Sequence, residues 1–151
     1  MGLNKDLRKF IELLNSNDVE YIIAGAYAYS FYARPRFTQD IDFFVRTSDE
    51  NATNMMQVIE HIGFASLGLE SKDFLVENQV IQLGVAPNRI DILTSISGVT
   101  FEEAWPNSRT ALLDEIPVRY LGREDLIRNK KASGRPQDFV DVAILEREQS
   151  N

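Results

Sequence analysis

Three aspartates are the residues of this chain best suited to chemistry. Asp40 and Asp42 stand two positions apart, and Asp91 follows in a later apolar segment. Side chains of a strand repeat their direction every two residues, so Asp40 and Asp42 point to one face with Cα atoms roughly 7 Å apart. Carboxylates gathered at one place repel one another, and a shared divalent cation relieves that repulsion. The pattern predicts a metal site formed by Asp40, Asp42 and Asp91.

The surroundings of Asp91 leave a structural alternative open. Asp91 lies between two isoleucines, where an uncompensated charge is costly. A cation shared with the other two aspartates would compensate it, and so would a salt bridge to Arg36 or Arg89. If a metal binds, Mg²⁺ is the expected ion, because it prefers oxygen ligands and is often held by a few carboxylates plus substrate phosphates. Two ions also fit, spaced about 3.5–4 Å apart as in two-metal phosphoryl-transfer sites.

A glycine turn precedes the acidic pair. The apolar run 21–24 reads as a buried strand, Gly25 turns the chain, and a helix begins directly after it. Such a turn leaves backbone N–H groups free to face a phosphate. Many glycines only turn a chain, but a turn of this kind followed by two aspartates favours phosphoryl chemistry.

The remaining pattern predicts the elements that must position these residues. Helical periodicity or end signals favour helices at residues 3–14, 26–33, 52–62, 101–105, 123–133 and 136–146. A capping box of Thr47 and Glu50 is expected to start the third helix, and Gly63 to stop it. Strands are expected at residues 21–24, 40–45, 80–85, 89–94, 110–113 and 118–121, with a hairpin turn at residues 86–88. Together they predict one α+β domain over residues 1–151, with a small mixed sheet, flanking helices and a short helical C-terminal tail.

The overall composition limits the kinds of molecule that the protein is expected to bind. The net charge of −7 argues against binding of duplex DNA, and no apolar run is long enough to cross a membrane. The chain has no cysteine, which excludes disulfides and thiolate chemistry and favours a cytoplasmic location. One basic run, residues 123–135, departs from the acidic balance. It predicts either an anion-binding patch or a solvated helix face.

Several of these segments together resemble a known family. The resemblance rests on Gly25-Ala26-Tyr27-Ala28, on the run from Arg36 to Asp42, on the run from Arg89 to Thr94, and on the tail from Lys130 to Asp138 with Asp141 after it. The chain is similar in these motifs to the polymerase-β-like nucleotidyltransferase superfamily, and most similar to its small prokaryotic members, which include minimal nucleotidyltransferases and abortive-infection toxins. The similarity extends from about residue 20 to residue 105 and includes the tail.

The resemblance implies a function and a role for each matching residue. The activity would be Mg²⁺-dependent transfer of a nucleoside monophosphate from a nucleoside triphosphate such as ATP to an acceptor hydroxyl. Asp40 and Asp42 would bind metal, and Asp91 would complete the site. Nucleotide contacts would come from Gly25, Ala26, Arg36, Thr38, Lys130 and Arg135. The acceptor could be a protein, an RNA end or a small molecule.

Ala26 departs from the family pattern. The family has Gly-Ser or Gly-Gly at the first motif, so a serine hydroxyl for the phosphate is missing here. If the second position requires a positive φ, alanine adopts it only at a cost. This keeps a second hypothesis open, a catalytically weakened relative that serves as a binding or regulatory module, for example in a toxin–antitoxin system.

Overall fold

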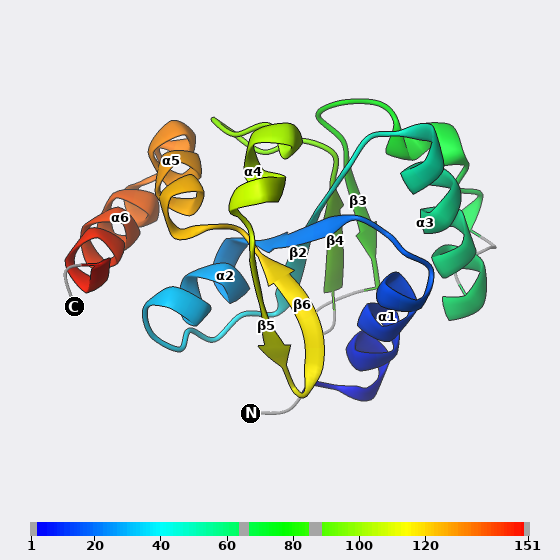
Figure 1. The fold of residues 1–151 in the computed structure, drawn as a ribbon, viewed down its shortest axis with the longest axis horizontal. Coiled ribbons are helices and arrows are strands. Elements are labelled where there is room, and N and C mark those ends of the chain that lie inside the picture. The colour runs from blue at the N-terminus through cyan, green and yellow to red at the C-terminus, as the bar shows by residue number, and fades with distance from the viewer. Residues whose placement is uncertain (1–2, 64–66, 85–88, 150–151) are drawn as a thin grey trace.

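The computed structural model describes residues 3–63, 67–84 and 89–149, with side chains as far as Arg147 (Figure 1). Six α-helices and six strands carry labels in this part of the chain. The helices are α1 (Lys5–Ser16), α2 (Gly25–Tyr32), α3 (Asp49–Ile62), α4 (Phe101–Asn107), α5 (Arg123–Ser133) and α6 (Pro136–Gln149), with a short 3₁₀ helix η2 (Ser71–Phe74). The strands are β1 (Tyr21–Ala24), β2 (Asp40–Val45), β3 (Val80–Leu83), β4 (Arg89–Leu93), β5 (Arg109–Leu113) and β6 (Ile116–Tyr120).

The strands form one mixed sheet in the order β3-β4-β2-β1-β6-β5. The central strand β1 pairs antiparallel with β2 and parallel with β6, while β2 pairs parallel with β4. Each edge is an antiparallel pair, β3 with β4 and β5 with β6. The predicted α+β class with a mixed sheet and flanking helices is therefore confirmed.

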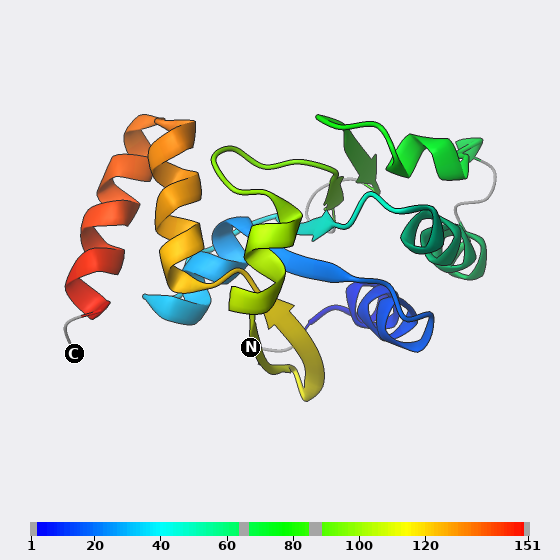
Figure 2. The same cartoon turned by 45° about the horizontal axis from the view of Figure 1, so that its top comes forward.

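Adjacent phenylalanines of β2 anchor the helices on opposite faces of the sheet. Phe43 packs against Phe10 of α1 with ring centroids 5.4 Å apart, and Phe44 meets Phe101 of α4 at 5.1 Å. Neighbouring strand residues point to opposite faces, so Asp42 shares the α4 side with Phe44. Figures 1 and 2 show α1 and α3 at one end of the molecule and α5 and α6 at the other.

The predicted start of α3 is wrong by one residue. Ser48, not Thr47, is the N-cap, and its hydroxyl accepts a hydrogen bond from the backbone N–H of Asn51. The buried Asn51 side chain fixes this register, because it bonds the backbone N–H of Glu20 at 2.7 Å and the carbonyls of Glu20 and Arg46. A long-range contact thus chooses between two neighbouring capping residues.

Other boundaries shift for local reasons. Helix α4 continues through Pro106 to Asn107, because a proline in the last turn removes only one hydrogen bond from an exposed helix end. Asp114 and Glu115 both take positive φ and make the two-residue turn between β5 and β6, so β6 already begins at Ile116. Gly63 ends α3 in the left-handed conformation, as predicted, and Gly134 ends α5 in the same way. The predicted turn at residues 86–88 lies outside the described residues.

No helix in the described part of the chain combines the length and the apolar character that crossing a membrane requires.

Candidate active site

The register of the sheet brings the three aspartates together. In the parallel pair of β2 and β4, Asp42 stands opposite Asp91, and in the antiparallel pair of β1 and β2 it stands opposite Ala24, just before Gly25. One carboxylate oxygen from each of Asp40, Asp42 and Asp91 lies within 4.8 Å of the other two. No second group of three acidic or histidine ligands gathers in this way among residues 3–63, 67–84 and 89–149.

The charge state of Asp42 reflects this crowding. Burial raises the pKa of the Asp42 carboxyl to about 7, and the negative charges of Asp40 and Asp91 contribute further to the increase. Three oxygen donors within a few ångströms suit a hard cation such as Mg²⁺, which would favour the ionised form of all three carboxylates. The donor set therefore fits a divalent metal.

The predicted salt-bridge alternative is also present. Arg89 donates hydrogen bonds to both Asp40 and Asp91, with 3.0 Å from its Nε to Oδ1 of Asp91. Arg36 has a different partner, Asp141, so of the two arginines weighed for this role Arg89 takes it. The gathering of the aspartates and the arginine contact therefore occur together.

Thr38 orients the first aspartate. Its Oγ1 donates to Oδ1 of Asp40 at 2.8 Å and lies 3.0 Å from the Asp40 carbonyl oxygen. The side chain thus fixes the carboxylate at the start of β2. In the sequence Thr38 is a candidate for this orienting role or for a phosphate contact, and the geometry favours orientation.

Gly25 lies directly against Asp42. Its φ is +64°, a conformation that only glycine adopts at little cost, and Ala26 is not among the residues with positive φ. The departure at the first family motif therefore causes no backbone strain at Ala26. Helix α2 begins here, and its first N–H groups lie beside the acidic cluster.

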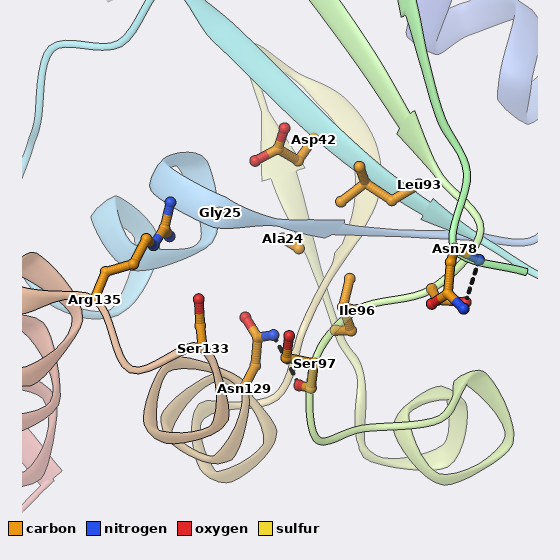
Figure 3. A pocket seen from close by; sticks show the side chains of 11 residues that line it. Ala24, Gly25, Asp42, Asn78, Leu93, Ile96, Ser97, Asn129, Ser133 and Arg135 are labelled. Atoms are coloured by element: carbon orange, nitrogen blue, oxygen red, sulfur yellow. Dashed lines mark hydrogen bonds between the residues drawn. The ribbon is translucent and has the colours of Figure 1, made fainter.

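A pocket of about 330 Å³ opens beside the turn (Figure 3). Gly25 and Asp42 form one side of it, Arg135 reaches in from the start of α6, and Asn129 of α5 lies across from them. Ile96 and Leu93 supply apolar surface, while three serines add hydroxyl groups. A charged end and a partly apolar end are what a nucleotide requires of its site.

The predicted phosphate-binding residues fall into two sets. Arg135 lines the pocket and is 74% exposed, although it also pairs with Asp138. Lys130 is buried and contacts Asp141 at 2.8 Å, and Arg36 contacts the same carboxylate at 2.9 Å while lying over the Tyr29 ring. Lys130 and Arg36 do not line the pocket and instead fasten α5 and α6 to α2.

Asp141 is the centre of this fastening network. Burial alone would raise the pKa of the Asp141 carboxyl, but hydrogen bonds from Arg36, Lys130 and Gln137 outweigh it and hold the pKa far below its ordinary value. The sequence places Asp141 in the family-like tail but does not reveal its partners. Neither Asn129 nor the residues around Ile96 can be identified from the sequence. A single amide on a predicted helix carries no signal for a site, and the stretch after β4 indicates only a loop.

Comparisons with known proteins identify the fold. No protein-family model and no curated protein matches the amino-acid sequence. Solved structures do match. ANT(2")-Ia, solved in complex with adenylyl-2"-tobramycin, has a TM-score of 0.58 and 14% identity over 95% of this chain and 91% of its own.

Two further structures agree with that match. The lincosamide antibiotic adenylyltransferase LnuA, solved with lincomycin, gives a TM-score of 0.55 at 12% identity, covering 96% of this chain and 97% of its own. An antigenic nucleotidyltransferase-like protein from Paracoccidioides brasiliensis gives 0.53 at 15% identity, covering 96% and 78%. Identities this low establish the fold alone. The chain has the fold of the polymerase-β-like nucleotidyltransferases.

Proposed function

We propose that this protein is a divalent-metal-dependent nucleotidyltransferase that moves a nucleoside monophosphate from a nucleoside triphosphate to the hydroxyl of a small molecule. The observation that supports this most is the meeting of Asp40, Asp42 and Asp91 within 4.8 Å beside the Gly25 turn. A phosphate-binding turn next to a metal-binding cluster is the arrangement that phosphoryl transfer requires.

Each residue has a proposed role in the reaction. Asp40, Asp42 and Asp91 would hold Mg²⁺, which supplies charge neutralisation at the reacting phosphate and polarises the attacking hydroxyl. The first N–H groups of α2 and the guanidinium of Arg135 would bind the triphosphate. Thr38 would keep Asp40 oriented, and Asp91 would receive the proton of the acceptor hydroxyl.

The proposed acceptor class follows from the structural neighbours and from the charge. ANT(2")-Ia was solved with an adenylylated aminoglycoside and LnuA with a lincosamide, both small molecules. The net charge of −7 disfavours a long nucleic acid as the acceptor. ATP is the first nucleotide to test, since both neighbours are linked to adenylyl transfer by these descriptions.

A thermal-shift experiment tests the proposal. The melting temperature is measured with ATP, GTP, CTP or UTP, each with and without Mg²⁺, for the natural protein and for Asp42→Asn. We expect stabilisation only when metal and nucleotide are both present, of about 2.7 kcal/mol at a ligand concentration 100 times the Kd. The variant should lose this response, while Asp49→Asn, an exposed aspartate in the first turn of α3, should keep it. A full response from Asp42→Asn would refute the site.

A second experiment identifies the product. The protein is incubated with α-³²P-labelled ATP, Mg²⁺ and the small-molecule fraction of a cell lysate, and labelled products are separated from ATP. Transfer should depend on Asp42 and release unlabelled diphosphate.

One observation favours the second candidate, a binding or regulatory module without catalysis. Arg89 pairs with both Asp40 and Asp91, as expected if the cluster has a structural role. Such a module would be stabilised by nucleotide equally with and without Mg²⁺ and would transfer no label.

A further inference from the structure

Arg89 lies where it can control the metal site. It precedes Asp91 by two residues on β4 and stands opposite Asp40 in the register with β2. Its Nη2 donates to Oδ2 of Asp40 at 2.5 Å and to Oδ2 of Asp91 at 3.0 Å, and its Nε donates to Oδ1 of Asp91 at 3.0 Å. The single guanidinium therefore contacts three of the four carboxylate oxygens of these two aspartates.

The fourth oxygen of these two carboxylates also has a hydrogen-bond donor. Oδ1 of Asp40 accepts the hydrogen bond from Thr38. Every carboxylate oxygen of Asp40 and Asp91 thus has a donor before any cation arrives. A divalent ion that binds these oxygens must displace or share hydrogen bonds with a positive charge, which lowers the net affinity for the free ion.

The Arg89 side chain also has space to move away from the two carboxylates. Its side chain is 35% exposed. A surface groove of about 300 Å³ lies beside it, lined by Arg89, Asp40 and the segment Phe37–Gln39. A change of rotamer into this groove would free the carboxylates without moving the backbone of β4.

We propose that Arg89 is a built-in counter-ion that a divalent cation must displace, so that the metal enters together with the nucleotide triphosphate and binds poorly alone. The proposal rests on the proposed function. A triphosphate would offset the cost of displacing Arg89 in two ways. Its oxygens would serve as further ligands of the metal, and they would accept hydrogen bonds from the released guanidinium.

Calorimetry of the whole protein with Mn²⁺ or Mg²⁺ alone tests the proposal, at one fixed pH and ionic strength. Removing the guanidinium in Arg89→Gln or Arg89→Ala should tighten binding of the free ion about tenfold or more. Arg89→Lys keeps the positive charge and should stay near the natural affinity. Arg128→Gln is the matched control, since Arg128 also pairs with two acidic residues, Glu103 and Asp125, away from the site.

The metal-free melting temperature gives an independent readout. It should fall in Arg89→Gln because the carboxylates lose their counter-ion, and added Mg²⁺ alone should restore it more than in the natural protein. If Arg89→Gln and Arg89→Ala bind the free ion no tighter than the natural protein, Arg89 positions the carboxylates and the counter-ion proposal is overturned. If the natural protein responds to no metal even with nucleotide, the proposed function fails as well.

Discussion

A Cβ atom added to Gly25 would lie 2.1 Å from Oδ2 of Asp42. The proposed phosphate-binding turn and the proposed metal ligand Asp42 thus leave no room for a side chain between them. The φ of +64° at Gly25 adds a second restriction at the same position. Glycine at position 25 therefore lets the backbone approach the Asp42 carboxylate closely.

Gly25→Ala should therefore displace Asp42. We expect a loss of about 2–3 kcal/mol in the free energy of unfolding and no Mg²⁺-dependent response to nucleotide. Gly63→Ala is the matched control, because Gly63 also has a positive φ but an added Cβ meets nothing within 4 Å. The control should lose about 1 kcal/mol and keep the response. Urea unfolding and thermal shift measure both quantities, and equal losses in the two variants would contradict the contact with Asp42.

The raised pKa of Asp42 predicts how stability depends on pH in the absence of metal. The native protein retains a proton on Asp42 up to about pH 7, whereas the unfolded chain releases it near the ordinary value of 3.8. The native state binds more protons in this window, so Asp42 lowers stability as pH rises from about 4 to about 7, by about 2 kcal/mol at this half-buried site.

Urea unfolding in EDTA at pH 5 and pH 8 checks this. The loss attributable to Asp42 should disappear in Asp42→Asn, whose side chain does not titrate. Added Mg²⁺ should stabilise the natural protein more at pH 8 than at pH 5, because a metal ligand must be deprotonated. A constant stability difference between the natural protein and Asp42→Asn at both pH values would exclude the raised pKa.

Asp141→Asn should destabilise the tail. The buried carboxylate neutralises Lys130 and Arg36, and its removal leaves a buried lysine without its closest counter-ion. The expected loss is about 3 kcal/mol in the free energy of unfolding. Glu146→Gln is the control, since the exposed Lys131–Glu146 pair at 3.5 Å should contribute less than about 1 kcal/mol. A loss no larger than that of the control would show that the network is not stabilising.

The two basic residues of the tail should respond differently to truncation. Arg135→Ala should weaken binding of the Mg²⁺–nucleotide complex about tenfold, since Arg135 is exposed at the pocket. It should lower the melting temperature less than Lys130→Ala does, because Asp138 keeps the Arg135 backbone N–H and Lys130 as partners. Lys130→Ala should lower the melting temperature by several degrees, because it leaves Asp141 and Asp138 under-compensated. Titration calorimetry of folded protein and thermal melts separate the two effects. Unchanged nucleotide affinity in Arg135→Ala would remove Arg135 from the site.

Much of the fold can be predicted from the sequence because the ends of helices and strands depend on the chemistry of neighbouring residues. Gly134 ends α5 and Pro136 begins α6, since only glycine adopts a left-handed cap cheaply and proline suits a first helical turn. The alternation in residues 40–45 predicts the strand and the shared face of Asp40 and Asp42. Thr47 and Ser48 are both suitable N-cap residues for α3, and the hydrogen bond between Asn51 and the backbone of Glu20 determines that Ser48 is the N-cap.

The sequence by itself determined the acidic trio, the glycine turn and the class of fold, because each rests on residue type and short spacing. Only the tertiary structure decided which arginine and lysine side chains pair with the aspartates. It assigned Arg89 to Asp40 and Asp91, placed the buried Lys130 and the half-buried Arg36 around Asp141, and left Arg135 at the pocket. Attraction between opposite charges depends on their distance in space and not on their separation along the chain. The pairing of acidic and basic side chains therefore follows from strand register and helix packing.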